Sequence, residues 1–317
     1  MGVFDLIRRF FSNRDYDIPR DDPRQVPHDL SLEVRYPPAL SVATLAERLG
    51  IAEGRLRNIE PNYNTFSIPK RSGGTRRIHA PSRELKAAQR RILRRLLARL
   101  NAHPTVCGFE RGQSTVTHAL LHAQQAVVVR LDIKNFFTST DASHVAKYFR
   151  QIGWNREAIR LITVLCTHDG ALPQGAPTSP RLSNLINYRM DARLAGLAQN
   201  QGAWYSRYAD DLTFSFAEDS GERIHTVIRG AHRIAEQHGY EIHQRRKRHI
   251  RRRHQQQLVT GLVVNQTVRL PRHIRRWLRA VEHHRRTGKP TTLSDSQWQG
   301  WQAYAAMVER QSGATPQ

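Results

Sequence analysis

The chain has 317 residues and carries 50 Lys and Arg against 27 Asp and Glu, a formal net charge of +23 at pH 7. This length can bury one large core or two to three lobes, and the positive charge indicates a polyanionic partner, with nucleic acid as the first candidate. No stretch approaches the roughly 20 apolar residues of a membrane span, no signal peptide is evident, and Cys107 and Cys166 have neither disulfide nor zinc spacing, so we expect a cytoplasmic protein without membrane contact.

The first 60 residues divide into a charged arm and a helical segment. Residues 1–38 are rich in Asp, Arg and Pro and lack sustained periodicity, which predicts a loosely ordered arm after one short helix. Ser41 can cap a helix that ends at Gly50, and a second helix is expected over 52–59. This helix pair also resembles a helix-turn-helix, which would indicate a DNA-binding regulator.

A basic hairpin and a basic helix follow. Residues 66–81, FSIPKRSGGTRRIHAP, contain two β-prone runs around a Gly-Gly turn, with Lys70 and Arg76 beside it. The hairpin can be an ordinary solvated turn or a finger that grips a triphosphate. Residues 82–100 predict one long helix, apolar on one side and rich in arginine on the rest, which either faces solvent or follows a phosphate backbone.

Three aspartates lie at the ends of predicted strands. Residues 124–140, QQAVVVRLDIKNFFTST, contain a strand of the buried type that ends at Asp132, where a charge is costly unless it binds something. Residues 203–216, AWYSRYADDLTFSF, predict two strands joined by a tight turn at Asp210 and Asp211. A turn favours Asp for local hydrogen bonds, but two acids at a hairpin tip can also share one site for a hard cation.

The rest of the chain is mostly helical by pattern. We expect helices over 141–167, after the proline-rich loop 172–180 as far as about 198, over 222–238, and in the tail from 271. A dense basic run occupies 245–254, and a strand is expected over 258–265, LVTGLVVN. One aspartate ending a strand and two on a hairpin, in a basic chain, are what two-metal phosphoryl transfer requires, with the metal ions about 3.5 to 4 Å apart.

The order of these motifs resembles the reverse transcriptases, and among them the bacterial retron type, over roughly residues 40–310. The resemblance implies an α/β (α+β) right-hand polymerase with fingers, a palm built on an antiparallel sheet, and a helical thumb. The implied boundaries are 1–38 for the arm, 39–265 for fingers and palm, and 266–317 for the thumb. The cofactor implied is magnesium, as two ions.

The resemblance also implies roles for individual residues. LDIKNFF and YADD place Asp132, Asp210 and Asp211 as catalytic metal ligands. Two further groups follow. The nucleotide-binding residues would be Lys70, Arg76, Gln174, Gly175 and Phe137, the last as a steric gate against ribose, with Phe136 packing in the core. The RNA-binding residues would be His118 and His122, in a departure from the usual Asn-Ala-x-x-His, together with Val259, Thr260 and Gly261.

The basic run departs from the family pattern, in which a lysine donates a proton to the leaving pyrophosphate. Arginine, with a pKa above about 12, is a poor donor. The role stays open among Arg246, Lys247 and His249.

The implied function is RNA-templated DNA synthesis, primed from a 2′-hydroxyl of a structured non-coding RNA that also serves as template. Its substrates are deoxynucleoside triphosphates, and its product is a branched RNA-DNA used in antiphage defence with a separate effector protein. The alternatives are another bacterial reverse transcriptase, of the group II intron or phage-exclusion type, a non-catalytic RNA-binding scaffold, or the helix-turn-helix regulator.

Overall fold

The computed structural model describes residues 39–70, 73–243 and 248–313. The predicted arm at 1–38, two residues of the basic turn at 71–72, and Arg246 and Lys247 lie outside the described residues. No helix in the described ranges is both long and apolar enough to cross a membrane.

The central element is a four-stranded sheet in the order β4-β5-β3-β6, in which every neighbouring pair is antiparallel. Its strands are β3 (Val127–Asp132), β4 (Ala203–Tyr208), β5 (Asp211–Phe216) and β6 (His249–Arg252). Both predicted strands of the aspartate hairpin and the buried strand that ends at Asp132 are confirmed. The expected α/β class with an antiparallel sheet is confirmed as well.

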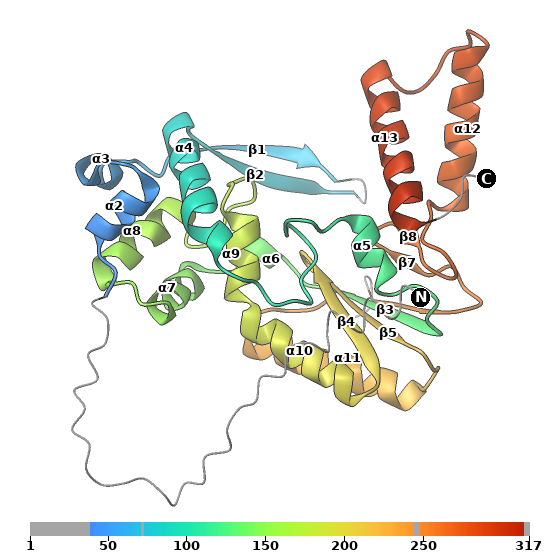
Figure 1. The fold of residues 1–317 in the computed structure, drawn as a ribbon, viewed down its shortest axis with the longest axis horizontal. Coiled ribbons are helices and arrows are strands. Elements are labelled where there is room, and N and C mark those ends of the chain that lie inside the picture. Colours follow the sequence, from blue (N-terminus) through green and yellow to red (C-terminus); the bar gives the residue numbers. More distant parts are fainter. Residues whose placement is uncertain (1–38, 71–72, 244–247, 314–317) are drawn as a thin grey trace, which may run out of the picture. The chain divides into compact units, whose positions relative to one another are not determined.

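Strand β3 is apolar on both faces because both faces of the sheet are covered. Val127, Val129 and Leu131 point into a core shared with helices α10 (Tyr188–Asn200) and α11 (Gly221–Gln237). Val128 points to the opposite face, into a smaller core that includes residues of α5 (Thr115–Leu120). Figure 1 shows α10 and α11 below the sheet and α5 above it. The alternation of side chains along a strand thus explains the run of valines.

A second, helical core lies on the N-terminal side of the described chain. The helices that contribute to it are α2 (Val42–Leu49), α3 (Glu53–Arg57), α4 (Arg83–Arg91), α7 (Ala142–Gln151), α8 (Arg156–Cys166) and α9 (Ser179–Ile186). Helix α2 begins at the Ser41 cap and ends at Gly50, which adopts the left-handed conformation with φ 63°, as predicted. The five-residue α3 buries Leu56 in the same core. The pair is therefore part of this core.

The single long helix expected over 82–100 is wrong beyond Arg91. The α-helix α4 continues as a π-helical segment, Ile92–Leu96, and a 3₁₀ turn, Leu97–Arg99. One of its basic side chains stabilises the fold, because Arg91 Nη1 donates to the carbonyl of Gly50 at 2.5 Å. The predicted helix before 198 is likewise broken at Asn187, between α9 and α10.

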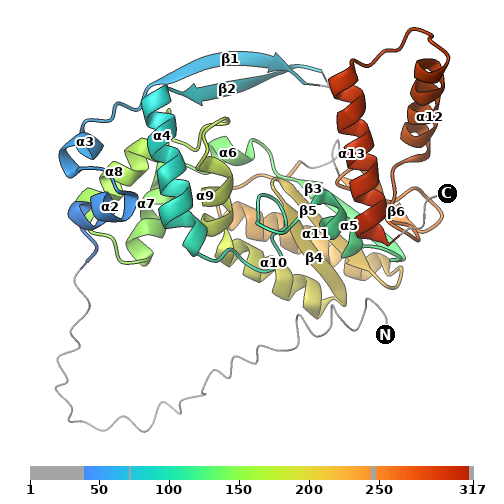
Figure 2. The ribbon, with the colours of Figure 1, turned by 45° about the horizontal axis from the view of Figure 1, so that its top comes forward.

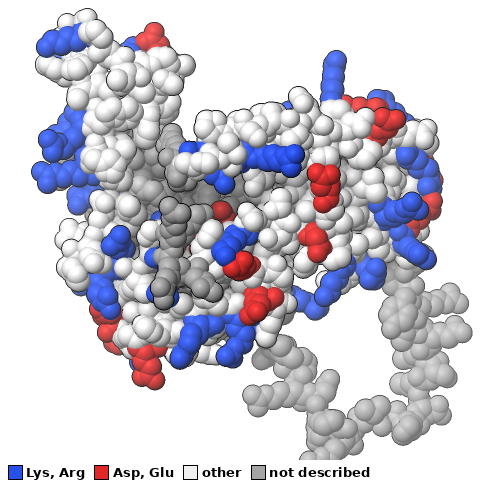
Figure 3. Space-filling view, turned by 180° about the vertical axis from the view of Figure 1, so that it is seen from behind, with Lys and Arg blue, Asp and Glu red and all other residues white. Residues whose placement is uncertain are grey.

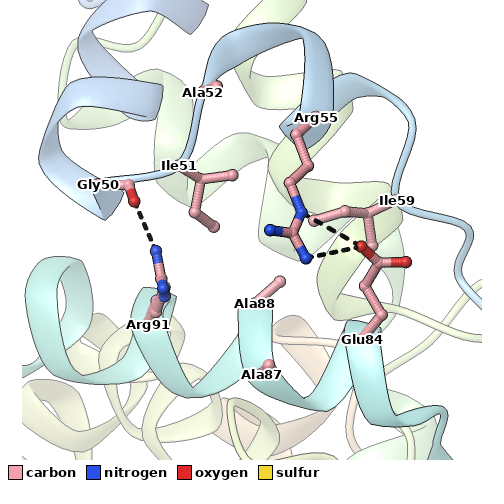
Figure 4. Close-up of a pocket in the computed structure, with 9 residues that line it drawn as sticks. All are labelled: Gly50, Ile51, Ala52, Arg55, Ile59, Glu84, Ala87, Ala88 and Arg91. Atoms are coloured by element: carbon pink, nitrogen blue, oxygen red, sulfur yellow. Dashed lines mark hydrogen bonds and ion pairs between the residues drawn. The ribbon is translucent and has the colours of Figure 1, made fainter.

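A pocket of about 260 Å³ opens between α3 and α4 in this helical part (Figure 4). Figure 4 shows Arg55 and Glu84 paired across it, with Arg55 Nη2 3.4 Å from Glu84 Oε1. The remaining lining is largely aliphatic. None of the three aspartates lines this pocket.

The basic hairpin consists of β1 (Tyr63–Pro69) and β2 (Thr75–Pro81), paired from Tyr63↔Pro81 to Pro69↔Thr75. Figure 2 shows the hairpin extending away from the N-terminal end of α4, which follows β2 in the chain. Most of its residues are exposed, which is expected of a two-stranded ribbon that no layer covers.

The C-terminal part contains a small hairpin and two helices. The single strand expected over 258–265 is wrong: β7 (Leu258–Val259) and β8 (Leu262–Val263) pair across a turn at Thr260 and Gly261. Thr260 and Gly261 both have positive φ, 46° and 83°, which a two-residue hairpin of this kind requires. Helices α12 (Arg272–Arg286) and α13 (Asp295–Ser312) follow and stand side by side in Figures 1 and 2.

Candidate active site

The backbone brings the three aspartates to one edge of the sheet. Asp132, the last residue of β3, is the register partner of Asp211, the first residue of β5. The amide of Ile133 donates to the carbonyl of Asp210 at 2.9 Å. Ala209 and Asp210 form the two-residue turn between β4 and β5, with Ala209 in the left-handed region at φ 57°. Residues about 80 positions apart in sequence thus meet at a single hairpin tip.

A guanidinium and an imidazole lie against two of these carboxylates. Arg130 Nη2 donates to both oxygens of Asp211, at 3.1 and 3.0 Å, and His243 Nε2 lies 3.3 Å from Asp132 Oδ1. Asp132 and Asp211 keep 17% and 25% of their side-chain surface exposed. Carboxylate oxygens at one accessible edge are the donors that hard divalent cations prefer. As the side chains stand in the described residues, however, no group of three or more His, Cys, Asp or Glu could hold a metal ion.

Two aromatic residues follow Asp132 on the short helix α6 (Phe136–Ser139). Phe136 is 4% exposed and packs in the sheet core, as predicted. Phe137 is half-buried, with its ring centroid 6.4 Å from that of Phe109. Phe109 is 47% exposed, has a positive φ of 63°, and also lies 6.4 Å from the ring of Tyr208. Sequence reasoning missed Phe109, although its dipeptide Gly108-Phe109 suits a turn.

The loop at Gln174 and Gly175 is attached to the basic hairpin. The amide of His79 in β2 donates to the carbonyl of Gln174 at 2.8 Å. Gly175 has φ 124°, and a Cβ there would lie 2.8 Å from the His79 carbonyl oxygen. A side chain at this position would clash with the backbone of β2, so the position requires glycine.

Lys70 and Arg76 lie on either side of the hairpin turn and are exposed. The amide of Lys70 donates to the carbonyl of Gly74 at 2.9 Å. Their contact with a triphosphate stays a prediction.

His118 and His122 are fully buried on the face of the sheet opposite α10 and α11. His118 Nε2 and His122 Nε2 lie 2.7 and 2.6 Å from Ser206 Oγ of β4. His122 Nδ1 lies 2.7 Å from Ser215 Oγ of β5. Both histidines have 0% exposure, so any effect on RNA would act through the placement of α5. Their predicted RNA-binding role stays a prediction.

Because these two histidines are buried, we expect the free energy of unfolding to fall in mild acid. Burial lowers the pKa of His118 to about 3 and that of His122 well below its ordinary value. In the unfolded chain both take up protons below about pH 6.5, whereas the folded chain does not. Each should therefore cost about 2 kcal/mol of unfolding free energy between pH 6.5 and pH 5.

Urea unfolding at pH 7 and pH 5 measures this loss. The His118→Gln, His122→Gln variant should be less stable at pH 7 but should lose about 4 kcal/mol less than the wild type between the two pH values. An equal loss in both proteins would contradict the burial of neutral histidines.

The segment Val259-Thr260-Gly261 meets the histidine segment. Thr260 Oγ1 donates to the carbonyl of Thr115 at 2.9 Å, and Val259, with 0% exposure, shares a core with Val116 of α5. Gly261 is exposed at the turn. Helix α13 packs on the same helix, since Ser114 Oγ donates to Gln311 Oε1 at 2.6 Å. The two segments expected to recognise RNA thus form one structural unit.

Of the three candidate proton donors Arg246, Lys247 and His249, only His249 lies within the described residues. Burial lowers its pKa, and so do the neighbouring Arg130 and Arg251 guanidinium groups. Its imidazole is therefore neutral near pH 7, which makes it a weak acid for this purpose.

Comparison with known proteins identifies the family. The sequence model described as "Reverse transcriptase (RNA-dependent DNA polymerase)" matches residues 68–257. The chain is 37% identical over 291 residues to the retron Mx65 reverse transcriptase of Myxococcus xanthus, covering 83% of this chain and 67% of that protein. It is also 34% identical over 288 residues to the retron Ec86 reverse transcriptase of Escherichia coli, covering 90% and 85%. The chain belongs to the retron reverse transcriptases.

This retron reverse transcriptase is an RNA-directed DNA polymerase of the right-hand fold. Family membership implies a divalent metal cation, an RNA template and a DNA product. The chain spans 65% of the length of another relative, the retron Mx162 reverse transcriptase of Myxococcus xanthus, with 34% identity over 315 residues.

Proposed function

We propose that the chain synthesises DNA on a structured non-coding RNA by two-metal nucleotidyl transfer with Mg²⁺. The observation that carries this proposal is the convergence of Asp132, Asp210 and Asp211 at one edge of the sheet. Asp132 and Asp210 are the residues that would hold the ions, with Asp211 in a weaker role because Arg130 contacts both its oxygens. The bound ions would activate the attacking hydroxyl and stabilise the leaving oxygen.

The rest of the site supplies binding and orientation. Lys70 and Arg76 would bind the triphosphate by charge. Gln174 would contact the nascent base pair, which is supported by the attachment of its loop to β2. The strongly basic surface supports binding of a nucleic-acid backbone. Figure 3 shows Lys and Arg side chains spread over one face of the molecule, with smaller acidic patches among them.

The retron relatives support a finer proposal about partners. The RNA acts as both template and primer, and a 2′-hydroxyl of it starts the DNA, so that the product is a branched RNA-DNA. The joined unit of α5 and the β7-β8 turn, with Thr260 bonded to Thr115, is the proposed recognition surface for this RNA. A separate effector protein and a role in antiphage defence complete the proposal.

Replacing Phe137 with Ala tests the proposed steric gate. Its half-buried ring projects from α6 near the ring of Phe109, where it would collide with a ribose 2′-hydroxyl. We expect incorporation of ribonucleotides relative to deoxynucleotides to rise at least about tenfold, roughly 1.4 kcal/mol of discrimination. Single-nucleotide extension of a DNA primer on an RNA template measures the ratio, and Phe136→Leu serves as a core-packing control. Unchanged discrimination in Phe137→Ala would remove Phe137 from this role.

The same primed assay tests the polymerase activity independently of any cognate RNA. Wild-type protein with Mg²⁺ should extend the primer on an RNA template, and the Asp210→Ala, Asp211→Ala variant should not. Equal extension by both proteins would disprove the assignment of the site.

A further inference from the structure

A fully buried ion pair contacts the Ala209-Asp210 turn. Arg207 in β4 and Asp191 in α10 both have 0% side-chain exposure. The guanidinium is held by both carboxylate oxygens, with Nε 2.8 Å from Oδ1 and Nη2 2.7 Å from Oδ2. Tyr205 donates its hydroxyl to the same Oδ1 at 2.8 Å. Burying two charges is expensive, and an apolar pair of similar volume is often as stable or more stable, so stability alone does not account for this pair.

The remaining donor of Arg207 reaches the turn that carries Asp210. Arg207 Nη1 donates to the carbonyl of Ala209 at 3.1 Å and to Asn184 Oδ1 at 3.2 Å. The next carbonyl, that of Asp210, accepts from the amide of Ile133 at 2.9 Å. Two successive carbonyls of the turn are thus fixed, one by Arg207 and one by the strand that ends at Asp132.

The same guanidinium also contacts the base of the other wall of the site. Its Cζ lies 5.5 Å from the ring centroid of Phe136, which begins helix α6 and precedes the proposed gate Phe137. Stacking of a guanidinium on an aromatic ring is favourable, and more so where both groups are desolvated. Arg207 therefore links the aspartate turn to the gate helix through one rigid, planar group.

We propose that Arg207, held in place by Asp191, is a positioning residue that fixes the Ala209 carbonyl and thereby presents Asp210 toward Asp132. Both side chains are fully buried, so this role involves no contact with the substrate. The inference rests on the proposed function, because it assigns a role in the reaction at Asp132 and Asp210. Lysine cannot replace the arginine fully, since one ammonium group cannot keep the two-pronged contact with Asp191 and also reach Ala209.

The decisive experiment separates positioning from stability. The triple variant Asp191→Leu, Tyr205→Phe, Arg207→Met replaces the ion pair and its tyrosine partner with apolar groups, and it removes the Arg207 donor from the Ala209 carbonyl and from Asn184 Oδ1. We expect a melting temperature close to that of the wild type, with kcat for primer extension lowered about 100-fold. The KM for the deoxynucleotide should change little, because no substrate contact is lost. Tyr205→Phe alone, which keeps the Arg207 contact with Ala209, should retain most of the wild-type kcat.

The inference would be overturned if the triple variant had both the melting temperature and the kcat of the wild type. If the triple variant does not fold, Arg207→Lys measured below its melting temperature decides the matter: a kcat equal to that of the wild type would overturn the inference, and a kcat lowered at least about tenfold at unchanged KM would support it. Absence of DNA synthesis in the wild type would instead disprove the proposed function.

Discussion

Replacing either Asp132 or Asp210 with Asn should lower the rate of DNA synthesis by at least about 1000-fold, roughly 4 kcal/mol of transition-state stabilisation. The backbones of these two residues meet where the end of β3 lies against the β4-β5 turn, and an amide cannot supply the negative charge that a divalent cation needs. Single-turnover extension with each variant, at saturating primer and deoxynucleotide, measures the effect.

Asp211→Asn should be the mildest of the three substitutions. Both Asp211 oxygens contact Arg130, so its charge is already partly neutralised in the structure. The matched control is Asp219→Asn, which alters an ion pair with Arg252 on the surface and should leave the rate unchanged. A rate loss in Asp211→Asn as large as that in Asp132→Asn would contradict the separation of roles.

Replacing Gly108 with Ala should lower DNA synthesis about 100-fold, because a displacement of the site by about 1 Å costs this much. A Cβ at Gly108 would lie 2.7 Å from the amide nitrogen of Ala209 and 3.2 Å from the carbonyl carbon of Tyr208. Both are backbone atoms where β4 enters the Ala209-Asp210 turn, so the turn itself has to move.

Gly54→Ala is the matched control for this substitution. Nothing lies within 4 Å of a Cβ at Gly54, a residue of helix α3, so this change should leave activity unaltered and slightly raise the free energy of unfolding. The kcat of both variants is compared under conditions where each is folded. Wild-type kcat in Gly108→Ala would show that the loop does not constrain the turn.

Local patterns were sufficient to predict the elements that carry the three aspartates. The aromatic and β-prone residues on both sides of the Ala-Asp-Asp turn predicted β4 and β5 closely, and the apolar run before Asp132 predicted β3. These features depend on neighbours in sequence, which is why they can be read without a structure.

The supports of the site could not be predicted in the same way. Gly108 and Ala209 are about 100 residues apart, and no local pattern records that their backbones touch. The pairing of Arg207 with Asp191 had a signal, since an arginine within an apolar strand is costly unless it is paired, but the partner lies on a different element. The two-strand turn at Thr260 was missed because Thr rarely adopts positive φ.

The most direct test of the central claim is DNA synthesis on the proposed partner RNA. The purified 317-residue protein is incubated with the structured non-coding RNA proposed as its partner, Mg²⁺ and labelled deoxynucleotides, without an added primer. The wild type should produce labelled DNA that remains covalently joined to RNA until the 2′ linkage is cleaved, and the Asp132→Asn, Asp210→Asn variant should produce none. Labelled DNA from the variant at the wild-type level, or no DNA from either protein on any RNA template, would contradict the account.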